Sequence, residues 1–187
     1  MKKISIAIII CNLSEEIEVI VPADLWRRAN IVVSLISAEK KKNLILQNGV
    51  KISCDDILVK ENLSKYSAIY LPGGKGCCDY LDEKCEKLVK YLKKNMLKKS
   101  FYLLSACASP SVIAKMGIID KINATVYPGY EKELKKYCNK NVVCDKNLIT
   151  TKAAGTIYDF ALTVISKFIS KEKANKIAMQ TCYKNWK

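Results

Sequence analysis

The chain has 187 residues, of which 50% are hydrophobic, with nine cysteines, no histidine and a formal net charge of +14. A chain of this length is predicted to form one domain, over residues 1–187, with enough buried surface to fold without a disulfide or metal framework. All but two of the basic residues are lysines spread along the chain, which indicates a solvated basic surface and no specific nucleic-acid site. Several cysteines lie inside apolar runs, so we expect a reduced, cytoplasmic protein.

Short apolar runs alternate with helical patterns from the N-terminus onward, which is typical of a doubly wound α/β fold. The first run, ISIAIIIC, resembles the apolar part of a leader, but acidic residues follow at once and no cleavage pattern intervenes, so a buried strand is predicted. Buried parallel strands are predicted over residues 4–11, 31–37, 66–72 and 100–106, and shorter peripheral strands over residues 51–54, 141–144 and 147–150. Helices are predicted over residues 82–97 and 155–169, and a charged loop over residues 39–43. The fold class is therefore a flavodoxin-like, mostly parallel sheet sandwiched by helices, and no run is long enough to span a membrane.

Three loops follow the carboxyl ends of predicted strands, where ligands bind in open α/β sheets. Their sequences are CNLSEEIE, LPGGKGCCD and SACASP. The small residues of SACASP suit a sharp turn from strand to helix, and Cys107 is predicted at its apex. There the start of a helix is expected to lower the pKa of the thiol, although an inert, packed cysteine would fit the same residues.

The neighbouring loops supply candidate partners for this thiol. In LPGG, two glycines allow close approach of the backbone, and the amides of Gly74 and Ala108 are candidate oxyanion donors. Glu18 follows the first strand, and Pro22 would deprive a continuous helix of its hydrogen bond to the Glu18 carbonyl. Held near a thiolate in a pocket, Glu18 would have a raised pKa and carry a proton. By spacing alone it is better explained as a solvated residue at a helix start.

Four segments in order resemble the ThiJ/PfpI superfamily, and within it the parkinsonism-associated protein deglycase (DJ-one) subgroup. They are SEEIEVIVPADLWRRANIVV, IYLPGGKG, LLSACASPSVIAKMGI and TTKAAGTIYDFALTVI. The resemblance implies that Cys107 is the nucleophile, Glu18 the protonated glutamate, and Gly74 and Ala108 the amide donors. It also implies a homodimer in which the segment around Glu18 lies near the partner.

The family often places a histidine near the nucleophile, in a segment that here reads ATVYPGY. Tyr127 takes that place, and it can donate a hydrogen bond or line the pocket but is a poor base at neutral pH. Without an imidazole, a Cys-His protease or amidotransferase is excluded. No metal is expected, because histidine ligands and a CxxC motif are both missing. The resemblance implies that no cofactor is needed.

Two functions are compatible with these residues. The first is a cysteine-dependent, cofactor-independent glyoxalase or deglycase that acts on methylglyoxal, glyoxal or their adducts. The second is a redox-sensing, chaperone-like protein whose Cys107 is oxidised to sulfinate with little or no turnover. Cys77 or Cys78 is a candidate resolving thiol for Cys107, with simple packing under the following helix as the alternative.

Overall fold

A computed structural model describes residues 3–81, 85–96 and 98–186 and contains a seven-stranded sheet with the strand order β5-β2-β1-β6-β7-β9-β8. Strand β8 pairs antiparallel with β9, and the other pairings in this sheet are parallel. The seven strands are β1 (Ser5–Ile10), β2 (Val32–Ser37), β5 (Asp56–Ile57), β6 (Ala68–Leu71), β7 (Tyr102–Ala106), β8 (Val142–Asp145) and β9 (Leu148–Thr151). The predicted fold class is confirmed.

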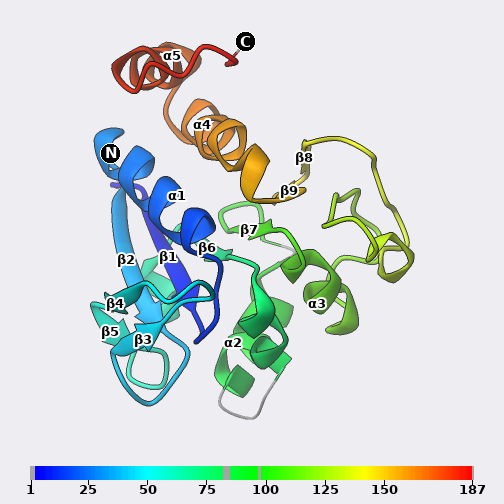
Figure 1. The fold of residues 1–187 in the computed structure, drawn as a ribbon. Coiled ribbons are helices and arrows are strands. Elements are labelled where there is room, and N and C mark those ends of the chain that lie inside the picture. Colours follow the sequence, from blue (N-terminus) through cyan, green and yellow to red (C-terminus); the bar gives the residue numbers. More distant parts are fainter. Residues whose placement is uncertain (1–2, 82–84, 97, 187) are drawn as a thin grey trace.

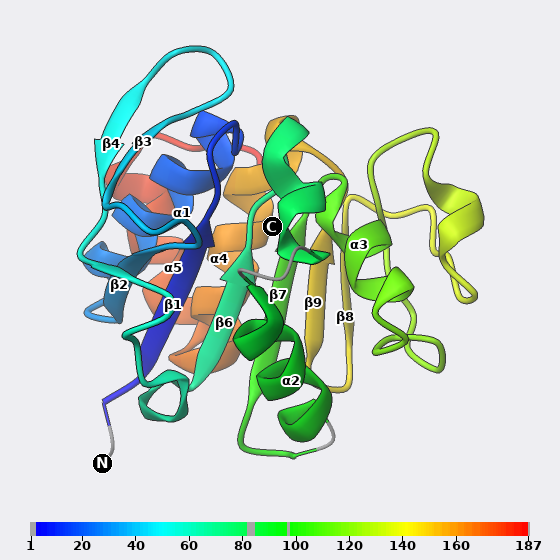
Figure 2. The same ribbon diagram turned by 90° about the horizontal axis from the view of Figure 1, so that it is seen from below.

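Helices cover both faces of the sheet (Figures 1 and 2). One face carries α1 (Glu16–Arg28), α4 (Ile157–Phe168) and α5 (Lys171–Gln180), and the other carries α2 (Glu86–Asn95) and α3 (Ser109–Lys115). Short 3-10 turns complete the chain: η1 (Leu63–Lys65), η2 (Lys75–Leu81), η4 (Glu131–Glu133) and η5 (Ala154–Thr156). The predicted start of a helix at Asp82 lies outside the described residues.

Alternate side chains of the central strand β1 enter two separate cores. Ile6, Ile8 and Ile10 pack toward α1 and α4, whereas Ala7 and Ile9 pack toward α2 and α3. This alternation is the period-2 pattern of a strand buried on both faces. It explains why the first apolar run is continuous rather than alternating with polar residues.

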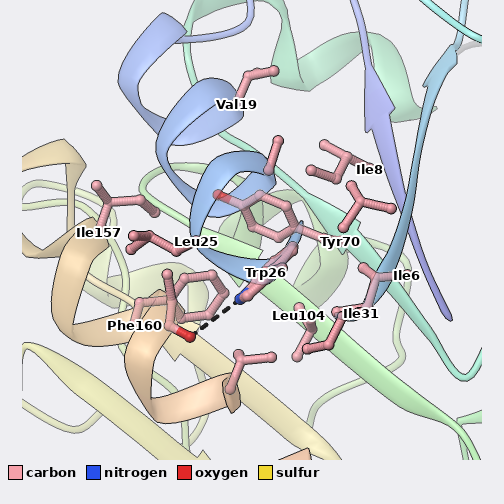
Figure 3. Close-up of a cluster of buried hydrophobic side chains, with 14 of the residues drawn as sticks. Ile6, Ile8, Val19, Leu25, Trp26, Ile31, Tyr70, Leu104, Ile157 and Phe160 are labelled. Atoms are coloured by element: carbon pink, nitrogen blue, oxygen red, sulfur yellow. Dashed lines mark hydrogen bonds between the residues drawn. The ribbon is translucent and has the colours of Figure 1, made fainter. Parts of the chain in front are cut away.

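An aromatic cluster anchors α1 and α4 to the sheet (Figure 3). Tyr70 lies 5.3 Å from Trp26 and 5.4 Å from Phe160, measured between ring centroids. The indole N–H of Trp26 donates to the carbonyl of Ala161, 3.1 Å away. Helix α1 is thereby fixed on the sheet through its buried side, and Glu18 lies on this helix.

Two of the predicted peripheral strands differ from the structure. Residues 51–54 contain β4 (Lys51–Ser53), which pairs with β3 (Asn43–Ile45) in a separate antiparallel hairpin, so the predicted charged loop ends where β3 begins. Strand β9, predicted as peripheral over residues 147–150, lies inside the sheet between β7 and β8 and is fully buried. The sequence does not predict this position, because the length of a short strand does not distinguish an edge strand from an interior strand. Helix α5 was not predicted.

A helix that spans a bilayer needs a long apolar run, and none of the helices within the described ranges provides one.

Candidate active site

Cys107 occupies the apex of a strained turn at the carboxyl end of β7. Its φ of 59° lies in the left-handed region, which costs an L-residue roughly 1–2 kcal/mol. Its amide donates to the carbonyl of Thr151 on β9 at 3.0 Å, and its own carbonyl accepts from the amide of Tyr127 at 2.8 Å. The surrounding strands therefore hold the strained backbone in place, and the predicted apex position of Cys107 is confirmed.

The glycine pair of the LPGG loop lets the backbone run against the apex. A Cβ on Gly73 would lie 2.6 Å from the Cβ of Cys107 and 2.9 Å from Glu18 Oε2. Gly74 has a φ of 95°, and a Cβ there would lie 2.4 Å from the amide nitrogen of Glu15. Both positions exclude any larger residue, so the two glycines are required by the site's geometry.

The loops after β1 and β6 are joined at this point, where the order of the sheet changes direction. Ser14 and Gly74 form an isolated antiparallel bridge, and the amide of Glu15 donates to the carbonyl of Gly73 at 3.1 Å. A change of direction in the strand order opens a crevice beside the carboxyl ends of the strands in α/β folds. Glu18, Cys107 and the glycine pair all lie at this crevice.

Glu18 is fully buried on α1 and points toward Gly73. Its Oε2 accepts a hydrogen bond of 2.7 Å from the Gly73 amide, while its own amide donates to the carboxylate of Glu15, which caps the helix at 2.9 Å. Helix α1 continues through Pro22. Proline has no amide hydrogen to donate to the Glu18 carbonyl, so this carbonyl accepts a hydrogen bond of 2.9 Å from the hydroxyl of Tyr70 instead. A tyrosine from the sheet thus replaces the missing helix hydrogen bond directly at the candidate acid.

Burial raises the pKa of the Glu18 carboxyl to about 7, and the charge of Glu15 adds to the rise, while the Gly73 amide and Cys107 oppose it. The direction agrees with the predicted protonated glutamate. At neutral pH a carboxyl with this pKa is divided between its two forms, so it can both donate and accept a proton.

The environment of the Cys107 thiol contradicts the predicted lowering of its pKa. Burial raises this pKa and the Glu18 carboxylate raises it further, while the backbone amides of Ala108 and Gly74 hydrogen-bond to the sulfur and lower it. Helix α3 begins at Ser109 and has only seven residues, so its dipole is too small to outweigh desolvation. A protonated Glu18 removes the opposing charge and leaves an O–H that can donate to the sulfur, so the two groups titrate as a pair.

The candidate amide donors are placed as predicted, and Tyr127 only in part. The amides of Gly74 and Ala108 both converge on the Cys107 sulfur. The backbone of Tyr127 lies beside the apex, and the residue is 44% exposed. Tyr127 is therefore only partly covered by the rest of the protein, and its role as a hydrogen-bond donor or pocket wall stays a prediction.

The candidate resolving thiols differ from each other. Cys77 is buried in the core beneath α2 and α3, and burial raises the pKa of its thiol to about 12. Cys78 is exposed. Packing in the core is therefore observed for Cys77 and not for Cys78, and a resolving role for either thiol stays a prediction.

A group with the spacing of metal ligands lies apart from Cys107 and contains Cys11, Glu39 and Asp79.

Comparison with known proteins agrees with this arrangement. The model of the DJ-1/PfpI family matches residues 4–167. The chain belongs to the DJ-1/PfpI family. It is 32% identical to Protein dj-1beta of Drosophila melanogaster over 178 residues, which cover 93% of this chain and 94% of that protein. It is 29% identical to the Glutathione-independent glyoxalase DJR-1.2 of Caenorhabditis elegans over 172 residues, 90% of each chain.

Among solved structures of the DJ-1/PfpI family, oxidized Toxoplasma gondii DJ-1 superposes with a TM-score of 0.91 at 26% identity, covering 97% of this chain and 99% of that chain. The similarity extends over the sheet and the helices of both faces. It confirms the flavodoxin-like architecture and the family resemblance that the four sequence segments indicated.

Two residues of this site were not found from the sequence. Gly73 was visible only as the first glycine of LPGG, and its contact with Cys107 depends on the close approach of β6 and β7. Tyr70 places one hydroxyl in an apolar strand, and a tyrosine in such a strand is usually explained by the packing of its ring. Pro22 was the available signal, because it shows that a helix carbonyl needs another donor.

Proposed function

We propose that this DJ-1/PfpI family protein is a cysteine-dependent, cofactor-independent glyoxalase or deglycase that acts on methylglyoxal, glyoxal or their adducts. The observation that carries the proposal is the convergence on the Cys107 sulfur of Glu18 and of the amides of Gly74 and Ala108. A nucleophile, a group that exchanges protons and a pair of oxyanion donors are the components needed for addition to a carbonyl. The relative named as a glutathione-independent glyoxalase supports this choice.

The reaction begins when Glu18 takes the thiol proton and the sulfur of Cys107 adds to the aldehyde carbon of methylglyoxal. The new alkoxide accepts hydrogen bonds from the two backbone amides and then the proton from Glu18, which gives a hemithioacetal. Glu18 next removes the proton from C1 and delivers it to the C2 oxygen, which gives an enediol. Glu18 then takes the proton of the C1 hydroxyl and delivers it to C2, so that C1 becomes a thioester while C2 becomes an alcohol. Water hydrolyses the thioester to lactate and restores the thiol, and the sum is methylglyoxal plus water to lactate.

Lactate formation from methylglyoxal tests this proposal. We expect turnover by the wild-type chain, a complete loss in Cys107→Ala, and a loss of about 10²–10⁴-fold in Glu18→Gln, the range for removing a general acid-base group. Gln keeps the shape of the carboxyl and its ability to accept from the Gly73 amide, so this variant isolates proton transfer. Undiminished turnover in either variant would refute the assignment.

We also propose a second candidate, redox sensing at the same thiol. Cys107 is partly exposed, so peroxide can reach the sulfur, and a protonated Glu18 can donate a hydrogen bond to the sulfinate that forms. Two molecules of hydrogen peroxide convert the thiol to sulfinate and release two of water. If peptide mass shows two added oxygens at Cys107 in a chain without lactate production, this function replaces the first.

A homodimer is the assembly we propose for either function. Apolar side chains are exposed at the start of α1, on the loop before it and on the adjoining β3-β4 hairpin: Leu13, Ile17, Ile20, Ile45 and Val50. The amide of Leu13 donates to the carbonyl of Ile45 at 3.0 Å, so loop and hairpin form one continuous surface. An apolar surface of this kind fits a second copy of the chain. Light scattering should give twice the chain mass for the wild type and the monomer mass for Ile17→Asp.

A further inference from the structure

A second cluster of reactive side chains lies on the opposite face of the sheet from Cys107. Cys11 directly follows β1, Glu39 follows β2, and Asp79 belongs to η2, which follows β6. These three strands are neighbours in the sheet, so their carboxyl ends bring the three side chains together. Cys11 packs with the core beneath α2 and α3, whereas Cys107 packs against the core beneath α1 and α4.

The distances within this cluster are close to those of a metal site. The Sγ of Cys11 and one carboxylate oxygen each of Glu39 and Asp79 all lie within 4.8 Å of one another. In a tetrahedral zinc site, bonds of about 2.0–2.3 Å place neighbouring ligand atoms roughly 3.3–3.8 Å apart. Small side-chain rotations would close the remaining gap. Cys11 is fully buried while both carboxylates are partly exposed, which gives an ion a path from solvent.

Three protein ligands leave the fourth position of a tetrahedral site to a water molecule, as in zinc sites that keep an open position. Cys85 is buried in the same core as Cys11 but does not belong to this group. Thiolate donors select a borderline or soft ion over magnesium or calcium.

The backbone around the cluster is fixed by hydrogen bonds. The amide of Asn12, next to Cys11, donates to Glu39 Oε1 at 3.4 Å. The hydroxyl of Tyr80, next to Asp79, donates to the carbonyl of Ile9 at 2.9 Å and so ties η2 to β1. The two ligand-bearing segments that flank β1 are thereby held against it, as a preorganised site requires.

A divalent ion would attract both carboxylates and displace the proton of the Cys11 thiol.

We propose that Cys11, Glu39 and Asp79 form a binding site for a divalent transition metal ion, of which zinc fits best, with a water molecule as the fourth ligand. Binding releases a proton from the Cys11 thiol and involves no oxidation or reduction. The ligands come from separate segments of the chain, which explains why sequence spacing predicted no metal. The site is independent of the reaction proposed at Cys107.

Cobalt and zinc titrations of the full chain, in the presence of a non-thiol reductant, test the proposal. We expect one Co²⁺ per chain with thiolate-to-cobalt charge-transfer absorption, which Zn²⁺ abolishes by displacement. Affinity should fall as the pH is lowered, because thiol protons compete with the metal. Absence of the charge-transfer absorption in the wild-type chain would overturn the proposal.

Matched variants locate the ion. Cys11→Ser should remove the charge-transfer absorption or weaken cobalt binding by at least about tenfold, and Glu39→Gln and Asp79→Asn should weaken binding to a similar degree. The two amide variants lie on partly exposed residues and keep the side-chain shape, so they decide the question even if Cys11→Ser fails to fold. Cys107→Ala and Cys77→Ser should bind cobalt as the wild type does. Loss of the absorption in either of these, or full binding in both amide variants, would refute the assignment.

Discussion

The hydrogen bond between Tyr70 and the carbonyl of Glu18 can be tested by removing one hydroxyl. Tyr70→Phe keeps the ring that packs against Trp26 and Phe160 but removes the donor 2.9 Å from the carbonyl. In an ordinary helix that carbonyl would accept from the amide four residues later, but here that residue is Pro22. The substitution therefore leaves a buried acceptor without a partner.

The expected loss follows from the cost of such an acceptor. An unsatisfied buried carbonyl costs about 1–3 kcal/mol, so the free energy of unfolding should fall by that amount in Tyr70→Phe. In a Pro22→Ala background, residue 22 regains an amide that can donate to the Glu18 carbonyl. There the same substitution should cost less than about 1 kcal/mol, the net value of a typical hydrogen bond.

Urea unfolding of the wild type, both single variants and the double variant gives the coupling energy directly. We expect a coupling of about 1 kcal/mol or more between Tyr70 and Pro22. Equal losses in the two backgrounds would show that the hydroxyl contributes nothing through this carbonyl, and the explanation for Tyr70 would be wrong. Lactate production in Tyr70→Phe would show in addition whether the position of Glu18 depends on the bond.

Three further outcomes follow from the site. Gly73→Ala would put a Cβ 2.6 Å from that of Cys107, so the free energy of unfolding should fall by about 1–3 kcal/mol and turnover should be lost; normal kinetics would contradict the geometry. The pKa of Glu18 is about 7 in the folded chain against an ordinary 4.5, so the folded chain holds a proton that the unfolded chain releases. The free energy of unfolding should therefore fall by up to about 3 kcal/mol as the pH rises from 4.5 to 7. Glu18→Gln should lack this contribution when urea unfolding is measured at several pH values. If its free energy of unfolding depends on pH as that of the wild type does, the raised pKa of Glu18 is refuted. Iodoacetamide should alkylate the exposed Cys78 much faster than the buried Cys77, as peptide mass spectrometry can follow, and equal rates would contradict the burial of Cys77.

The main strands of the fold can be predicted from the sequence, because a strand buried on both faces has a continuous run of apolar residues. This signal predicted β1, β2, β6 and β7 within a few residues. It could not separate β9 from an edge strand, because β9 has only four residues, all buried, and its place in the sheet is set by pairing with β7. The β3-β4 hairpin was missed in part because β3 directly follows a run of charged residues.

The sequence predicts those parts of the candidate site that depend on local backbone conformation. Small residues around Cys107 predict a sharp turn, and a glycine pair predicts close approach. The pKa of the thiol was predicted with the wrong sign, because helix position can be judged from sequence whereas desolvation depends on what surrounds the sulfur after folding. The contact of Glu18 with Gly73 likewise joins segments that are distant along the chain.

The left-handed backbone at Cys107 has a consequence for how this position can change. Glycine adopts a φ of 59° without strain, and asparagine does so more readily than most residues, so selection for folding stability alone would tend to replace the cysteine. A chain that keeps cysteine here gives up conformational stability for the reactivity of a sulfur atom. Variants recovered by screening for heat resistance without a functional readout should therefore accumulate substitutions at this one residue.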